Sequence, residues 1–252
     1  MKIVVTGLFV CLLVATSAHA QTVARAPVCP PMPEIAAALP DIERMAHEGD
    51  AFAQVTIGLM CVIAGKYDEG APWLKKAAEQ GELRAVITLA GLYEGGLGVP
   101  ANPVEAARLN RQAAEQGVGA AQYTLAMMYL EGRGVPRDEA EGLRWMMLAA
   151  EQDCTLQPGL RDGDPSCGRA QLRLAIESIS GRHVPQDYAR AYFWADLAVV
   201  YSVPKDQPAA ARLREAAETM LSQAQLEDAK RQSREWKPLL PPKILPKLTL
   251  RR

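Results

Sequence analysis

The string Ala-Ala-Glu-Gln-Gly occurs at Ala77–Gly81 and again at Ala113–Gly117, and a variant ending in Asp occupies Ala149–Asp153. Successive copies are 36 residues apart. A second string, Gly-x-Gly-Val-Pro, occurs at Gly96–Pro100 and at Gly132–Pro136, again 36 residues apart. Two different strings that keep the same period indicate an internal repeat, in which one supersecondary unit recurs along the chain.

One period is long enough for two helices joined by a turn. From about residue 120 to residue 131, Leu125 and Tyr129 fall on one face at helical spacing. Gly132 can adopt the left-handed conformation that ends a helix, and Asp138 suits the N-cap of the next helix. Since a single helix pair cannot bury its apolar face, neighbouring pairs must stack. The sequence therefore predicts an all-α fold of stacked helix pairs.

A large apolar residue fills the same position of the second helix in each period: Trp73, Leu109, Trp145 and Trp194. The turn string returns as Gly181–Pro185, one period plus 13 residues after Gly132–Pro136. We therefore expect a fourth repeat, preceded by an insertion. The first repeat has no copy of the turn string and is expected to be a shortened version.

These residues resemble the Sel-one-like repeat (SLR) family, a relative of the tetratricopeptide repeat. The stretches AVITLAGLYEGGLGVP (85–100) and AAQYTLAMMYLEGRGVP (120–136) are similar to the first helix and turn of that family, and DYARAYFWADLA (187–198) is similar to its second helix. The resemblance implies a tetratricopeptide-like α/α superhelix, that is, a right-handed solenoid. It implies four repeats within residues 44–202, at about 50–81, 82–117, 118–153 and 167–202, closed by capping helices at 205–236.

The terminal segments differ in composition from the repeats. Residues 1–20 contain Lys2, an apolar run and the sequence Ala18-His19-Ala20, which is typical of a signal peptide cleaved after Ala20. A retained anchor is the alternative. A proline-rich lead follows at 21–43, and residues 237–252 form a proline-rich tail with five basic residues and no acidic ones. We expect a periplasmic or secreted protein without an integral membrane span after cleavage.

Four cysteines remain after cleavage, which suits disulfide formation in an oxidising compartment. Cys154 and Cys167 flank the insertion before the fourth repeat, and a bond between them would close a short loop. Cys29 would then pair with Cys61 and attach the lead to the first repeat. Four cysteines allow three pairings, so the other two remain open.

Most chemical functions find little support in the sequence. The net charge of −1 gives no basic field for nucleic acid, and the two imidazoles that remain after cleavage, His47 and His183, provide neither a zinc site nor a catalytic triad. Ser202–Lys205 fits the Ser-x-x-Lys pattern of serine β-lactamases and penicillin-binding proteins, but the sequence has no SDN or KTG partner motif. We expect no catalytic residues, no metal and no cofactor. The alternative is a weak hydrolase or binder of β-lactam or peptidoglycan-like ligands.

The face of each first helix that lies opposite its buried face is free to contact a partner. We call these positions the first-helix strip: Thr88, Tyr123, Thr124, Met127, Glu131, Arg173 and Ile176. An apolar-to-polar strip suits a helix or an extended peptide laid along a groove. The alternative is that its apolar members only pack on neighbouring first helices. The sequence predicts an exported adaptor that holds a protein or peptide partner, such as a cell-envelope protein, in the concave groove of a solenoid.

Overall fold

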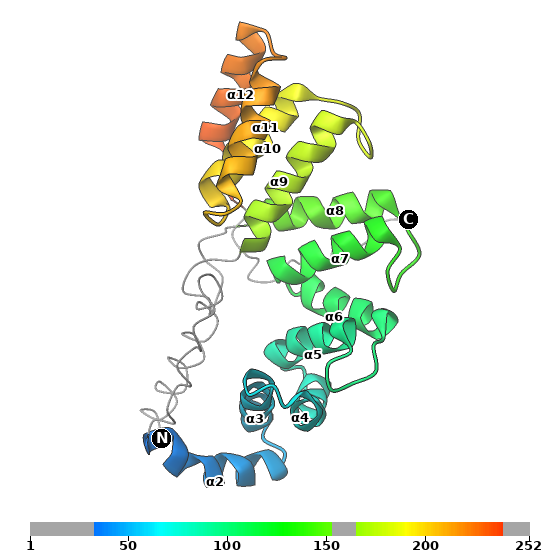
Figure 1. The fold of residues 1–252 in the computed structure, drawn as a ribbon, viewed down its shortest axis with the longest axis vertical. Coiled ribbons are helices and arrows are strands. Elements are labelled where there is room, and N and C mark those ends of the chain that lie inside the picture. The colour runs from blue at the N-terminus through cyan, green and yellow to red at the C-terminus, as the bar shows by residue number, and fades with distance from the viewer. Residues whose placement is uncertain (1–32, 153–164, 239–252) are drawn as a thin grey trace. The chain divides into compact units, whose positions relative to one another are not determined.

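A computed structural model describes residues 33–152 and 165–238 of the 252-residue chain. Within these ranges the regular secondary structure is helical, and neighbouring helices pack against one another within each compact unit (Figure 1). The predicted all-α fold of helix pairs is confirmed. The signal peptide, the proline-rich lead up to residue 32, Cys29, Cys154 and the tail beyond residue 238 lie outside the described residues.

The chain divides into two compact units, and the boundary falls inside α6 (Pro103–Glu115), after Leu109. The first unit contains α2 (Pro33–His47), α3 (Ala51–Ile63), α4 (Tyr67–Glu79) and α5 (Leu83–Gly95). The second unit contains α7 (Gly119–Glu131), α8 (Glu139–Ala150), α9 (Pro165–Ser180), α10 (Tyr188–Tyr201), α11 (Gln207–Glu218) and α12 (Gln223–Glu235).

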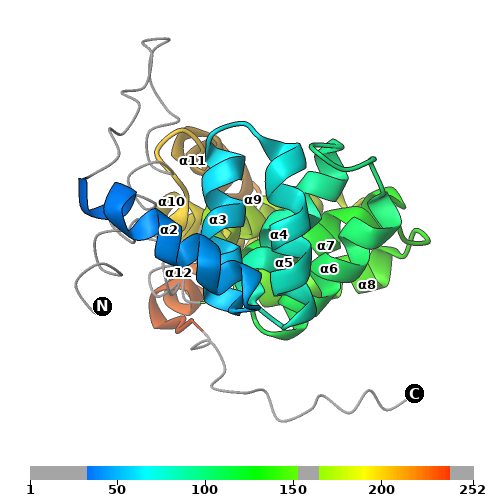
Figure 2. The same cartoon turned by 90° about the horizontal axis from the view of Figure 1, so that it is seen from below.

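Small residues allow the paired helices of the first unit to approach closely. A Cβ placed on Gly58 of α3 would lie 2.6 Å from the Cγ of Leu74, which is fully buried on α4. A Cβ on Gly70 would lie 2.8 Å from the carbonyl oxygen of Gly58. Figure 2 shows α3 and α4 side by side. The glycines therefore fix the distance between these helices, and Leu74 fills the space beside them.

The α7–α8 pair of the second unit is built in the same way. A Cβ on Gly142 of α8 would lie 2.8 Å from the Cγ of Leu130 and 3.1 Å from the carbonyl oxygen of Ala126, both on α7. Trp145 is buried, and its indole N–H donates a hydrogen bond to the carboxylate of Glu141 at 2.9 Å. The large residue of the repeat thus lies in the core with its polar atom satisfied.

Helix ends and helix starts recur with the repeat. The helices α5 and α7 end on the left-handed Gly96 and Gly132, as the sequence predicts. The side chain of Asp138 accepts a hydrogen bond from the backbone N–H of Glu141 and caps α8, which confirms the predicted N-cap. Asp187 caps α10 in the same way. The first glycine of the turn string therefore ends one helix, and the aspartate two residues after the string caps the next.

The last two helices pack on the fourth helix pair. Tyr192 of α10 is buried together with Ala217 of α11 and Leu226 and Ala229 of α12. A capping box opens α12: the Ser222 side chain accepts from the backbone N–H of Gln225, whose side chain reaches back to the N–H of Ser222. A small core thus extends from α10 to the last helix.

Candidate functional site

The first-helix strip is divided between the two units. Thr88 lies on α5 in the first unit, whereas its other members lie on α7 and α9 of the second unit. α7 and α9 contact each other. Tyr123 and Met127 of α7 are half-buried, and Ile176 of α9 is 40% exposed. These three residues keep apolar surface after the helices have packed.

The two threonines of the strip use their hydroxyls within their own helices. Thr88 donates to the carbonyl of Arg84 at 2.8 Å, and Thr124 donates to the carbonyl of Ala120 at 2.9 Å. Such bonds to the preceding helical turn are common for threonine. The hydroxyls therefore have partners before any ligand binds.

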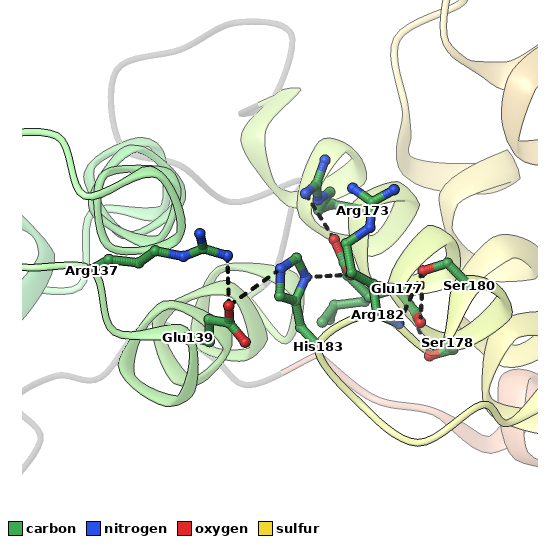
Figure 3. Close-up of polar contacts among 9 residues, drawn as sticks. Arg137, Glu139, Arg173, Glu177, Ser178, Ser180, Arg182 and His183 are labelled. Atoms are coloured by element: carbon green, nitrogen blue, oxygen red, sulfur yellow. Dashed lines mark hydrogen bonds and ion pairs between the residues drawn. The ribbon is translucent and has the colours of Figure 1, made fainter.

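The charged members of the strip also have partners. Glu131 pairs with Arg133 at 3.4 Å on the surface. Arg173 pairs with Glu177 at 2.8 Å, and Glu177 is buried (Figure 3). The arrangement gives Arg173 a structural task, because a buried carboxylate needs a nearby positive charge.

His183 links the same carboxylate to the helix of the preceding repeat. Its Nδ1 lies 2.7 Å from Glu177 Oε2, and its Nε2 lies 3.8 Å from Glu139 on α8. Arg137 pairs with Glu139 at 2.6 Å. Figure 3 shows these side chains in a row, from the turn before α8 to α9. These contacts connect the turn at Gly181–Pro185 to α8 and α9.

A hollow that the sequence analysis missed lies over the second helices of the second unit. Two adjoining cavities of about 230 and 370 Å³ share Met147 of α8 and Asp187, Arg190 and Trp194 at the start of α10. We call them together the second-helix groove. The smaller cavity is completed by Leu143, Leu174, Ser178, Val184, Pro185 and Gln186. The larger is completed by Glu151, Ala189, Phe193, Gln232 and Trp236.

Three aromatic side chains, Phe193, Trp194 and Trp236, line the larger cavity. Phe193 and Trp194 meet edge to face, with ring centroids 4.8 Å apart. Trp236, the residue after α12, is half-buried and lies edge-on to Tyr201 at 5.6 Å. Figure 1 shows α10 and α12 next to each other in the second unit. The consecutive aromatics of α10 and the isolated Trp236 were the sequence signals for this surface.

Glu151 contributes a partly desolvated charge to the groove. Its side chain is half-buried, and burial raises the pKa of its carboxyl above the ordinary value. Across residues 33–152 and 165–238, no basic side chain pairs with it. The carboxylate could therefore accept a cation from a ligand.

The Ser-x-x-Lys pattern lies at the end of a helix. Ser202 is the C-cap of α10 and is 6% exposed, whereas Lys205 is exposed in the following turn. A Cβ on Gly168 would lie 2.6 Å from the Cα of Ser202, so the serine is covered by α9. A serine nucleophile of that class requires an accessible hydroxyl at a helix start, with the lysine one turn along.

In the described part of the chain, no cluster of three His, Cys, Asp or Glu side chains could hold a metal ion.

The cysteines agree with the expected pairing only in part. Cys167 is buried and disulfide-bonded, and because Cys154 is outside the described residues, its bond to Cys167 stays a prediction. Cys61 is a free thiol among the described residues, and because Cys29 lies outside them, the expected Cys29–Cys61 bond also stays a prediction.

Comparison with known proteins agrees with this fold. The Sel1 repeat family matches residues 65–82, 87–118, 119–154 and 168–199. No curated protein matches the chain. None of the helices in the described ranges is long and apolar enough to cross a membrane.

Three crystal structures are similar. A Sel1 repeat protein from Oxalobacter formigenes has a TM-score of 0.58 at 24% identity, over 82% of this chain and 84% of that one. A protective antigen of uropathogenic Escherichia coli with an SLR fold has a TM-score of 0.49 at 25% identity, over 80% of this chain and 48% of that one. A putative Sel1 repeat protein from Klebsiella pneumoniae has a TM-score of 0.40 at 19% identity, over 77% and 98%. The four matches show that the chain contains Sel1 repeats, and the first of these structures shares its fold.

Proposed function

We propose that the chain is an exported, non-enzymatic adaptor that binds a partner protein or peptide on the first helices of its repeats. One observation carries the proposal: Tyr123, Met127 and Ile176 keep apolar surface on α7 and α9 after the helices have packed. Apolar side chains that recur along neighbouring helices suit an amphipathic helix or an extended peptide.

The polar members of the strip already have partners, so we expect the apolar members to supply most of the binding free energy. Thr124 and Arg173 have partners within the second unit, and breaking these to reach a ligand would cost their present hydrogen bonds. Binding is therefore expected to depend on Tyr123, Met127 and Ile176, with the polar residues setting the edge of the contact.

The location of the adaptor is proposed from two separate features. The signal-peptide pattern of residues 1–20 directs export. The disulfide at Cys167 supports an oxidising compartment, because such bonds are rare where thiols are kept reduced. We place the partner in the cell envelope or outside the cell.

The test is affinity capture from a cell-envelope extract with the mature full-length chain. The double variant Tyr123→Ala, Ile176→Ala is compared with Val200→Ala, because Val200 of α10 is 66% exposed and lies outside the strip. We expect the double variant to lose a partner that the wild type and the control both retain. Equal capture by all three proteins would refute the strip as the binding surface.

A further inference from the structure

The second-helix groove has the composition of a site for an extended proline-rich segment. Phe193, Trp194 and Trp236 line the larger cavity. Aromatic grooves bind polyproline II segments because flat rings pack well against prolines that are already extended, so little entropy is lost. The larger cavity is distinct from the first-helix strip, since its walls come from α8, α10 and α12 and the residues that cap them.

The chain carries such a segment, and the segment begins at the groove. Trp236 follows α12 with φ −60° and ψ 133°, close to polyproline II values. The next residue, Lys237, precedes Pro238, and a residue before proline is restricted to extended conformations. The sequence then continues as LLPPKILPKLTLRR at 239–252.

The charges of the two parts are complementary. The groove contains the carboxylates of Glu151 and Asp187 and one basic side chain, Arg190. Residues 239–252 contain four basic side chains and no acidic one. Glu151 is the expected partner of one of these cations, because it is half-buried and has no ion pair among the residues that the structure describes. Arg190 would disfavour a lysine placed beside it, so the cation is expected at the Glu151 end.

We propose that residues 239–252 bind in the second-helix groove of the same chain, as an extended proline-rich segment over Phe193 and Trp236. No linker has to be spanned, because Trp236 itself lines the groove. A polyproline II segment advances roughly 3.1 Å per residue, so any six residues of 239–252 would extend about 19 Å along the groove. Because the segment is attached to the chain beside the groove, its effective concentration there is roughly millimolar. A weak intrinsic affinity is therefore sufficient for binding.

The test is site-specific photo-crosslinking in the full chain. Phe193 is replaced by benzoylphenylalanine, and the matched control carries the same group at Tyr123, an aromatic position on α7 that is half-buried like Phe193. We expect the group at 193, and not that at 123, to form links to peptides from residues 239–252. Links from both positions, or from neither, would overturn the proposal.

A mixture of ¹⁴N-labelled and ¹⁵N-labelled chains identifies the source of the segment. Links within one chain give unmixed isotope pairs, which is the expected result. Mixed pairs would show that the segment comes from a second copy and would overturn the same-chain assignment. Circular dichroism on both labelled proteins establishes that they are folded.

A variant within the segment provides an independent measurement that does not alter the folded units. Pro241→Ser and Pro242→Ser together, with the label at Phe193, are expected to abolish the link, because the segment loses its extended bias. An unchanged link would contradict the proline-rich mode of binding. Failure here leaves the adaptor proposal intact, because that depends on capture of another protein through Tyr123 and Ile176.

Discussion

The side-chain amide of Gln152 donates a hydrogen bond to Oε1 of Gln122 at 2.7 Å and another to the carbonyl of Gly117 at 2.9 Å. Gln122 in turn donates to the carbonyl of Ala114 at 3.1 Å. Both glutamines are buried. The end of one repeat is therefore connected to the turn that ends the preceding repeat, through two amides shielded from water.

The first unit contains the same pair of amides. Gln80 donates to Oε1 of Gln54 at 2.9 Å and to the carbonyl of Gly49 at 3.1 Å. Gln54 is buried and donates to the carbonyl of Ala46 at 3.1 Å. This explains Gln80 and Gln152, the glutamines of the first and third copies of the repeated string, which donate to backbone carbonyls at helix ends.

Replacement of Gln152 by Ala is expected to destabilise the second unit. The change leaves Oε1 of Gln122 and the carbonyl of Gly117 without their donor, and such a loss costs about 1–3 kcal/mol of unfolding free energy. Urea unfolding of the mature chain measures the change. Gln116→Ala is the matched control, because Gln116 holds the same place in the preceding string and is exposed, and because the residue 36 positions before Gln122 is Val86, which has no amide. Equal losses in the two variants would contradict the role of the amide pair.

Gly98→Ala is expected to destabilise the first unit more than Gly96→Ala. Both glycines have positive φ, 67° and 63°, so both variants carry the cost of a left-handed alanine, roughly 1–2 kcal/mol. A Cβ at Gly98 would in addition lie 2.2 Å from the carbonyl carbon of Tyr67, which is backbone that cannot rotate away. At Gly96 the nearest atom is the Cβ of Ala101 at 3.3 Å. Thermal unfolding of both variants compares them, and equal midpoints would argue against the close contact.

Local features of the fold could be predicted because they depend on a few neighbouring residues. Gly132 ends α7 in a left-handed conformation and Asp138, two residues after the turn string, caps α8, as expected from the sequence. Periodicity predicted that Leu125 and Tyr129 face the core, and both are buried. These outcomes follow from backbone sterics and helix geometry, which depend on the types of residues close together in the sequence.

The second-helix groove could not be predicted in this way. Its walls combine Glu151, Phe193 and Trp236, which are far apart in sequence and meet only after α12 has folded onto α10. The strip residue Arg173 could be placed on α9, but its pairing with Glu177 could not, because Glu177 is a charged residue at a buried position. Pattern analysis assigns charged residues to the surface, so it misses buried ion pairs.

Disulfide mapping is expected to give one free and one bonded cysteine among those described. Alkylation of the native chain followed by non-reducing digestion should recover Cys61 in a linear, alkylated peptide, since it is a free thiol. Its reaction should be slow near neutral pH, because burial raises the pKa of the Cys61 thiol and the thiolate is the reactive form. Cys167 should be recovered in a linked peptide, with Cys154 as the expected partner. A peptide that joins Cys61 to Cys29 would contradict this expectation and support the pairing expected from the sequence.

Glu151→Gln is expected to make the chain more stable at neutral pH, with a difference that disappears in acid, when it is compared with wild-type Glu151 in a chain whose four basic residues between 239 and 252 are replaced by Gln. Burial raises the pKa of the Glu151 carboxyl in the folded state, so the folded state holds this proton more tightly than the unfolded state does. The wild type should therefore lose stability as the pH rises from the ordinary carboxyl pKa, about 4.3, and the loss should level off above the raised pKa. The glutamine variant does not titrate and lacks this loss. Urea midpoints measured from pH 4 to pH 7.5 test the expectation, with Glu115→Gln as control because Glu115 is the exposed equivalent in the preceding repeat. Parallel midpoint curves in that chain would contradict an uncompensated, half-buried carboxylate at Glu151. In the unaltered chain the difference should be smaller, because we assign one of the basic residues of the proline-rich segment to Glu151.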